Sequence, residues 1–187
     1  MWSTSERPLP EPWRSFLATL DRNLPQPVAL HCLGGFALIF LYGAPRVTED
    51  IDALEMVPNS AIEPVLGLMG RGSDVAKEFG IYLDYVRVAT YPEDYERRLV
   101  PMYEDLFQQL RIFALDPYDL ALCKIERNSR KDREDVKFLG VKIPLETAPL
   151  QERYDRELRP NLLNPRPCDL SLKLWIEMIE EERFGRS

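Results

Sequence analysis

The sequence predicts an α/β protein, with a small mixed β-sheet flanked by helices and a helical C-terminal half. Two observations support this fold class. Over residues 1–115, segments with the composition of β-strands alternate with segments whose apolar residues have helical spacing. From residue 116 onward, the apolar spacing is mainly helical. We therefore expect a core over residues 1–115 and a helical region over residues 116–187 that packs on the core.

The composition is typical of a globular protein. The 187 residues are 45% hydrophobic and 29% charged, which indicates neither a disordered chain nor a membrane protein. The longest apolar run, residues 28–43, contains a histidine, a cysteine and a Gly-Gly break, and it falls short of the roughly 20 residues that span a bilayer. A net charge of −7 argues against non-specific binding to nucleic acid, because such binding depends on basic side chains. A local basic site is still permitted.

The cysteines and the N-terminus indicate the compartment. Cys32, Cys123 and Cys168 are odd in number and lack Cys-x-x-Cys or Cys/His spacing, so neither a disulfide framework nor a zinc site is predicted. The chain has no basic segment followed by an apolar leader at its start. We expect a cytoplasmic protein that does not associate with membranes.

The first elements in chain order are a helix and a strand. The apolar spacing of residues 13–20 fits one face of a helix, and residues 28–33 form an apolar run that fits a buried strand. His31, the only histidine, lies in this strand. A lone histidine in an apolar strand is more often packed than catalytic, so we place it in no site.

Residues 33–57 carry the densest functional signal. A Gly34-Gly35 turn opens a short apolar helix over residues 36–42, and Gly43 with the following Ala-Pro ends it. After a polar loop, Asp50 and Asp52 begin a strand. Side chains at positions i and i+2 of a strand point to the same face, so these two carboxylates project together.

Paired carboxylates next to a glycine turn predict a metal and nucleotide site. Two carboxylates a few ångströms apart repel by roughly 4 kcal/mol at an effective dielectric constant near 20, and a divalent cation is the usual relief. Hard oxygen ligands without nearby His or Cys favour Mg²⁺ or Mn²⁺, and Mg²⁺ is typically held by one or two carboxylates plus substrate phosphates. Glycines at a helix N-terminus let a triphosphate approach free backbone N–H groups. The pattern therefore predicts a nucleoside triphosphate bound with its metal.

The pattern Gly34-Gly35, Arg46, Thr48 and Asp50-Ile51-Asp52 resembles the signature of the DNA polymerase β-like nucleotidyltransferase superfamily. More specifically, it resembles minimal members related to AbiEii-type toxins, over about residues 28–139. The resemblance implies a nucleotidyltransferase fold and transfer of a nucleotidyl group from a nucleoside triphosphate such as ATP to a hydroxyl of RNA, a protein or a small molecule. It implies that Asp50 and Asp52 are catalytic metal ligands, and it assigns the nucleotide-binding residues Gly34, Gly35, Arg46 and Thr48.

Two further expectations follow from the resemblance. AbiEii-like relatives are often toxins, so an antitoxin partner is implied. No base-recognition signature follows the motif, so the sequence predicts neither the nucleotide nor the acceptor. A fold with a Gly-Gly turn and two solvated aspartates would produce the same pattern without any site.

After the Asp50 strand, the sequence predicts a helix and another strand. Residues 60–63 have a capping-box pattern that starts a helix running to about residue 69, and residues 80–88 are β-branched and aromatic enough for a strand. Asp84 lies in that strand. Superfamily members often carry a third acidic residue on a neighbouring strand, so the resemblance makes Asp84 a candidate catalytic residue and metal ligand. The alternative is a solvated aspartate on an edge strand.

Three more elements complete the predicted core and open the C-terminal region. Residues 91–109 alternate charged and apolar residues with helical spacing, and Pro92 suits a first helical turn. Residues 110–115 predict a strand. Asp116-Pro117 then caps a new helix.

Residues 119–136 resemble the AbiEii-type pattern of a helix with an inward lysine, a basic turn, and aspartates on the next helix. Lys124 interrupts an apolar helical run, where an amine must reach the surface or meet an anion such as a triphosphate. The resemblance makes Lys124 catalytic and nucleotide-binding, and Arg130 nucleotide-binding. Because an amine held against an apolar face is costly, we expect Lys124→Ala to leave the fold at least as stable. A solvated, salt-bridged surface is the alternative.

Asp132 is the last predicted site residue, with a catalytic role implied by the same resemblance. If the second helix begins near residue 131, Asp132 and Asp135 share a face. We expect them to face the cleft that contains Asp50 and to hold Lys124 or Arg130 in position. The alternative is that Asp132 has no role in the site and is present because the helix dipole favours a carboxylate at a helix N-terminus.

The last two helices are predicted at residues 147–158 and 169–183, with a Pro-rich link between them. The final helix has a broad apolar surface that would pack on its own domain or meet a partner. Two other functional classes stay open: a non-catalytic nucleotide-binding or regulatory module, and a scaffold that dimerises through this helix. The presence of Asp50, Asp52 and Lys124 favours the enzyme. A scaffold would give Asp50 and Asp52 no function.

Overall fold

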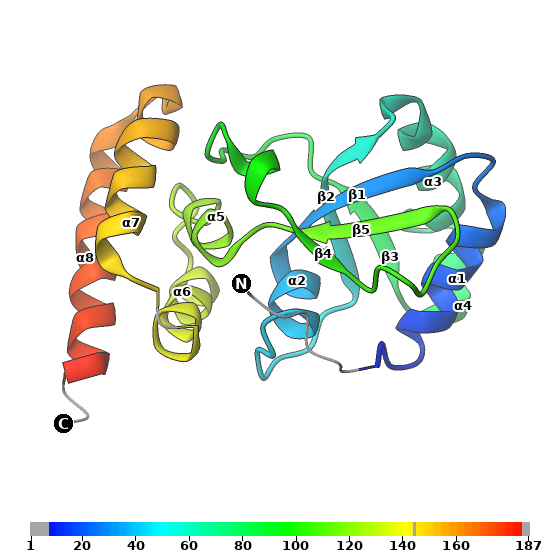
Figure 1. Cartoon of the computed structure of the whole chain (residues 1–187), viewed down its shortest axis with the longest axis horizontal. Helices are drawn as coiled ribbons and strands as arrows, with labels where there is room; N and C mark the ends of the chain where they lie inside the picture. The colour runs from blue at the N-terminus through cyan, green and yellow to red at the C-terminus, as the bar shows by residue number, and fades with distance from the viewer. Residues whose placement is uncertain (1–7, 144, 185–187) are drawn as a thin grey trace. The chain divides into compact units, whose positions relative to one another are not determined.

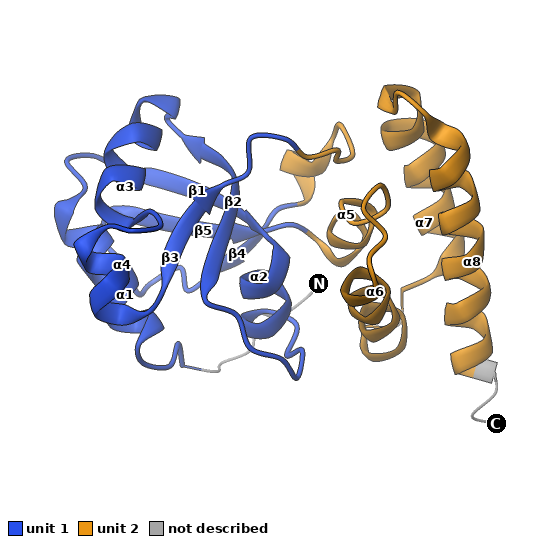
Figure 2. Ribbon diagram, turned by 180° about the vertical axis from the view of Figure 1, so that it is seen from behind, with its two compact units in different colours: residues 1–88, 99–115 blue, residues 89–98, 116–187 orange. Residues whose placement is uncertain are grey.

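The computed structural model describes residues 8–143 and 145–184 and shows a mixed five-stranded sheet with helices around it, which confirms the predicted α/β fold (Figure 1). The chain divides into two compact units (Figure 2). The first unit comprises residues 1–88 and 99–115, and the second comprises residues 89–98 and 116–187. The predicted core over residues 1–115 differs from the first unit in the placement of residues 89–98.

The sheet lies in the first unit. Its strands are β1 (Val28–Leu33), β2 (Asp50–Val57), β3 (Tyr82–Tyr85), β4 (Val100–Met102) and β5 (Leu110–Ala114). They are ordered β3-β2-β1-β5-β4. Pairing is antiparallel between β1 and β2 and between β4 and β5, and parallel between β1 and β5 and between β2 and β3. The strand β3 is therefore at one edge, directly beside the strand that begins with Asp50.

Four α-helices accompany the sheet in the described part of the first unit. They are α1 (Trp13–Asn23), α2 (Gly34–Phe40), α3 (Ile62–Met69) and α4 (Asp74–Phe79). The helices α1, α3 and α4 lie together, and α2 lies beside the end of β1 (Figure 1). The predicted apolar face of α1 is buried, and the ring of Trp13 packs on Phe36 and Phe40 of α2 with centroid separations of 5.5 and 5.2 Å.

Two local predictions for this part of the chain are wrong. Residues 91–109 form no single helix but contain the 3₁₀-helix η2 (Tyr95–Arg98) and the strand β4, because pairing of β4 with β5 overrides the helical spacing. Ser60 does not cap α3. It lies inside the 3₁₀-helix η1 (Asn59–Ala61), and the N-cap of α3 is Ala61, which makes no side-chain capping bond.

The second unit is helical in its described part. After η2, its elements are α5 (Pro117–Leu122), α6 (Arg130–Lys142), α7 (Thr147–Arg153), the π-helical turn η3 (Tyr154–Leu158), the 3₁₀-helix η4 (Arg159–Asn161) and α8 (Pro165–Phe184). Asp116 caps α5 as predicted, by accepting the backbone N–H of Asp119 at 2.8 Å.

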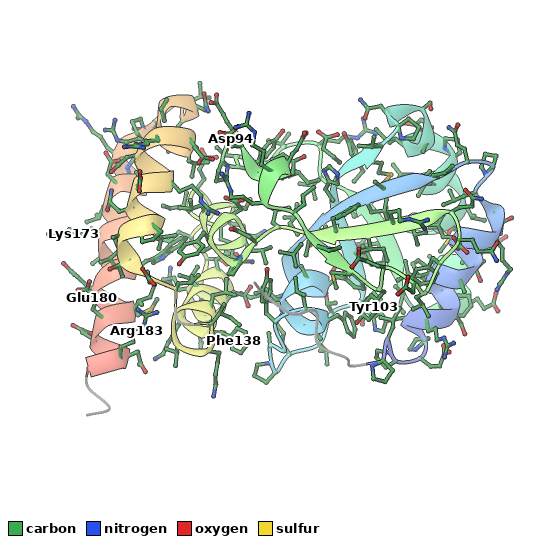
Figure 3. The ribbon with its side chains drawn as sticks, in the orientation of Figure 1. Asp94, Tyr103, Phe138, Lys173, Glu180 and Arg183 are labelled. Carbon is green, nitrogen blue, oxygen red and sulfur yellow. The ribbon has the colours of Figure 1, made fainter. Side chains whose placement is uncertain are left out.

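The helices α6 and α8 approach each other closely. A Cβ atom added to Gly140 of α6 would lie 2.5 Å from a side-chain carbon of Ile179 in α8. Near the C-terminal end of α8, the guanidinium of Arg183 (Figure 3) donates two hydrogen bonds to the carbonyl oxygen of Gly140, at 3.0 and 3.1 Å. Glycine at position 140 is thus needed for helix packing. Over the described part of the chain, no helix combines the length and hydrophobicity that crossing a bilayer requires.

Candidate active site

The predicted acidic residues of the first unit lie on one face of the sheet. In β2, Ile51 and Ala53 are buried, whereas Asp50 and Asp52 alternate with them on the more open face. The parallel register of β2 and β3 places Asp52 opposite Asp84. Residues opposite each other on neighbouring strands point to the same face, so Asp84, which is exposed, shares the face of the other two.

The glycine turn lies against these aspartates. Gly34 begins α2 with φ of +70°, a conformation that glycine adopts without the cost that a Cβ atom brings. A Cβ atom added to Gly34 would lie 2.0 Å from Oδ2 of Asp52. The first turn of α2 therefore contacts the Asp52 carboxylate directly, and both conformation and space require glycine there.

The second glycine lies against the other two motif residues. A Cβ atom at Gly35 would lie 2.6 Å from Oγ1 of Thr48 and 2.7 Å from Nη2 of Arg46. The two residues of the Arg-x-Thr segment thus meet the glycine turn on one side. Thr48 also donates a hydrogen bond of 2.5 Å to Oδ1 of Asp50. Residues separated by up to 18 positions in the sequence are therefore gathered around the start of β2.

The two carboxylates of Asp50 and Asp52 fit a hard divalent cation whose other ligands come from the substrate. Among residues 8–143 and 145–184, no group of three or more His, Cys, Asp or Glu side chains is arranged to hold a metal ion. Asp50 and Asp52 would supply two carboxylates, which is the number that Mg²⁺ commonly takes when substrate phosphates complete its coordination. Gly34, which lies against Asp52, adds no side chain of its own there.

Two site residues escaped the sequence analysis. The hydroxyl of Tyr82 in β3 donates to Oδ2 of Asp50 at 3.3 Å, and the guanidinium of Arg71 lies 3.9 Å from the centre of the Tyr82 ring. Burial raises the pKa of Tyr82, and the negative charge of Asp50 raises it further, so the hydroxyl stays protonated. In the sequence, Tyr82 precedes Asp84 by two residues and therefore shares its face of the strand. Its contact with Asp50 becomes apparent only when the register of β2 and β3 is known.

The thiol nearest this site is not a nucleophile. Burial strongly raises the pKa of Cys32, and the charge of Asp52 raises it further. The thiolate is the reactive form of cysteine, so a thiol that stays protonated is inert.

The predicted residues of the second unit form a cluster of their own. Lys124 is buried, and its Nζ lies 2.9 Å from Oδ2 of Asp135 and 3.7 Å from Oδ1 of Asp132. The two aspartates lie on the buried side of α6. The anion that this lysine meets is therefore a carboxylate of its own chain. Arg130, in contrast, is exposed and pairs with Glu134 at 3.0 Å.

Asp132 has several donors around a fully buried carboxylate. It accepts from Nε of Arg127 at 2.8 Å and from the backbone N–H and hydroxyl of Ser129, with which it forms a capping box at the start of α6. Burial alone would raise the pKa of Asp132, but the hydrogen bonds from Arg127 and Ser129 outweigh it and hold the pKa well below the usual range. Asp132 is thus ionised and serves the helix N-terminus. That it faces the same cleft as Asp50 is a prediction about both units and stays a prediction.

The second unit holds another buried charge network, which the sequence did not predict. Asp119 lies between Arg98 at 3.0 Å and Arg153 at 2.9 Å, and Arg98 also pairs with Glu157 at 2.6 Å. Burial raises the pKa of Asp119 to about 6, with Asp116 adding to the rise and the two arginines opposing it. The network joins residues 89–98 to α5 and to the turn after α7.

A comparison with models of protein families identifies a match that covers most of the chain. A family model described as a nucleotidyltransferase of unknown function (DUF6036) matches residues 16–183, which is nearly the whole chain. No curated protein and no solved structure matches the chain significantly.

Proposed function

The chain belongs to this family of nucleotidyltransferases of unknown function (DUF6036), and on that basis we propose that it transfers a nucleotidyl group from a nucleoside triphosphate to a hydroxyl in a metal-dependent reaction. The observation that carries the proposal is the meeting of Asp50, Asp52 and the backbone of Gly34 on the open face of β2. The family match supports the reaction class, and the geometry supports the residues.

Asp50 and Asp52 are the proposed metal ligands, with Asp84 as a third acidic group. When bound there, Mg²⁺ or Mn²⁺ would supply positive charge against the phosphates of the substrate. The hydroxyl groups of Thr48 and Tyr82 donate hydrogen bonds to the Asp50 carboxylate. Arg46, with Thr48, lies against the glycine turn, where it would orient the triphosphate.

The proposed reaction forms a bond from the acceptor oxygen to the α-phosphorus and breaks the bond from that phosphorus to the leaving pyrophosphate. The proton of the acceptor hydroxyl needs a base. Asp84 is exposed, lies opposite Asp52 and is the carboxylate proposed to take this proton if it does not bind metal.

We further propose that Lys124 and Arg130 contact the triphosphate and that Asp132 holds Lys124 in position. Lys124 would neutralise charge that develops on the leaving phosphates. Its ammonium is held by Asp135 and Asp132, so a role at phosphate requires it to exchange a carboxylate for the ligand.

The acceptor is proposed to be a hydroxyl of RNA, a protein or a small molecule, with ATP among the candidate donors. A toxin of the AbiEii-like branch, neutralised by an antitoxin, is the biological setting that the sequence resemblance supports. Growth arrest on expression of the wild-type chain, absent for Asp50→Asn/Asp52→Asn, is the expected result for a toxin.

The reaction is tested by label transfer. The purified protein is incubated with Mg²⁺ or Mn²⁺, each of four α-³²P-labelled nucleoside triphosphates, and either total RNA or cell protein depleted of nucleotides. We expect transfer of the label to one acceptor class by the wild type and none by Asp50→Asn/Asp52→Asn. Metal-dependent nucleotide binding without label transfer or pyrophosphate release would instead identify a non-catalytic nucleotide-binding module.

A further inference from the structure

Both oxygens of the Asp50 carboxylate accept hydrogen bonds from hydroxyl groups. Thr48, in the loop before β2, donates to Oδ1 at 2.5 Å, and Tyr82, in the neighbouring strand β3, donates to Oδ2 at 3.3 Å. An ionised carboxylate has about four lone-pair positions. Two neutral donors therefore fix the orientation of Asp50 and leave capacity for a cation.

Arg71 determines the direction of the hydrogen bond from Tyr82. Its Nη2 donates to the Tyr82 hydroxyl oxygen, and its guanidinium lies 3.9 Å from the centre of the ring. Because a guanidinium has donors only, the hydroxyl oxygen must accept from Arg71, and the hydroxyl proton is left for Asp50. Donors and acceptors linked in this way also strengthen one another. In the described part of the chain, Arg71 forms no ion pair with a carboxylate, and its guanidinium instead interacts with Tyr82.

The turn that carries Arg71 is attached to β3. Gly70 forms a parallel bridge with Leu83, the residue after Tyr82. A Cβ atom at Gly70 would lie 2.4 Å from the carbonyl oxygen of Leu66, and Gly72 has φ of +88°. Glycines on both sides thus allow a tight turn that places Arg71 over the Tyr82 ring.

From this geometry we propose that Tyr82, held by Arg71, is a positioning residue that fixes the Asp50 carboxylate for the catalytic metal. The proposal rests on the proposed function, because it presumes that Asp50 is a metal ligand. Partners that orient metal ligands typically change metal affinity by 10- to 100-fold when they are removed. Tyr82 touches neither the metal nor the substrate in this account and acts only through Asp50.

The test measures Mn²⁺ affinity in Tyr82→Phe, which removes the hydroxyl and keeps the ring under Arg71. Tyr85→Phe is the matched control, because Tyr85 is in the same strand but lies opposite Ala53 and so shares the other face. Electron paramagnetic resonance gives the dissociation constant for Mn²⁺ alone and with a non-hydrolysable α,β-methylene triphosphate. A parallel titration in EDTA gives the affinity for the metal-free analogue.

We expect Tyr82→Phe to bind Mn²⁺ about 10-fold more weakly than the wild type, with unchanged affinity for the metal-free analogue, and Tyr85→Phe to match the wild type. Arg71→Met should weaken Mn²⁺ binding in the same direction, and combining it with Tyr82→Phe should add little, because Arg71 acts through the hydroxyl.

The possible failures are distinguishable. If Mn²⁺ binding by the wild type depends on Asp50 but Tyr82→Phe binds as tightly as Tyr85→Phe, the positioning role is wrong and the proposed function stands. If Tyr82→Phe loses metal-free nucleotide affinity and thermal stability to the same extent as Mn²⁺ affinity, its role is structural. If the wild type shows no Mn²⁺ binding that Asp50→Asn abolishes, both the positioning role and the proposed metal site fall.

Discussion

The buried aspartates of the second unit and Asp50 of the first unit have different partners. In the described part of the second unit, each buried aspartate lies next to a cation: Asp116 and Asp119 next to Arg153, Asp132 next to Arg127, and Asp135 next to Lys124. Asp50 in the first unit accepts instead from the neutral hydroxyls of Thr48 and Tyr82. A carboxylate that is already paired with a cation has little to gain from a metal, whereas the neutral donors of Asp50 leave it able to bind one.

The ion pair of Lys124 reverses the stability effect expected from the sequence. Lys124→Ala leaves Asp135 buried without its cation, and breaking a buried pair in this way costs about 3–5 kcal/mol. Urea unfolding should therefore show a clearly destabilised variant, and Lys124→Met/Asp135→Leu should recover most of the loss. Nucleotide affinity measured on the folded Lys124→Ala protein decides its role at phosphate, because unchanged affinity would leave a purely structural lysine.

Gly34 tests the contact between the glycine turn and Asp52. Gly34→Ala must place a Cβ atom at positive φ and displace the Asp52 carboxylate. Gly80→Ala is the matched control, since Gly80 has φ of +66° and its added Cβ would meet no atom within 4 Å. Both variants should lose about 1–2 kcal/mol from backbone strain, measured by urea unfolding, but only Gly34→Ala should lose metal-dependent nucleotide binding. If both variants lost metal-dependent nucleotide binding to the same extent, Gly34 would have no specific role in the site.

At the scale of single elements, local signals predicted the structure where the element depends on its own residues. The strand β1 and the apolar face of α1 follow directly from sequence periodicity. The six-residue helix α4 was not predicted, because fewer than two helical turns show too little periodicity and it lacks the Asp-Pro start that indicated the equally short α5. The three-residue strand β4 depends on its pairing with β5, which is not visible in local spacing.

The start of α6 gives a prediction about acid stability. The folded-state pKa of Asp132 lies below that of the unfolded chain, so its stabilisation is fully present above about pH 4 and is lost as pH falls toward the folded value. Asp132→Asn should therefore be less stable than the wild type at pH 7 and show a shallower loss of unfolding free energy between pH 4 and pH 2. Urea titrations at a series of pH values measure both quantities. An unchanged acid slope would contradict this assignment.

At the scale of the whole molecule, the glycine turn and the Asp-x-Asp strand could be predicted from sequence because 19 consecutive residues contain them. The side-chain contacts around them could not. Tyr82 reaches Asp50 only through the register between strands about 30 positions apart, and the placement of Lys124 against Asp135 depends on the packing of α5 and α6. Contacts between residues that are far apart in the chain produce no periodic pattern in the sequence.

The measurement that tests the central claim most directly is thermal unfolding with metal and nucleotide. Nucleoside triphosphate with Mg²⁺ or Mn²⁺, at a hundred times its dissociation constant, should stabilise the wild-type protein by roughly 2.7 kcal/mol. Asp50→Asn/Asp52→Asn should gain no such stabilisation, because it lacks the carboxylates that hold the metal. Repeating the scan with four nucleotides also reports the base preference. An equal rise in melting temperature for both proteins would show that nucleotide binds without these aspartates and would contradict the proposed site.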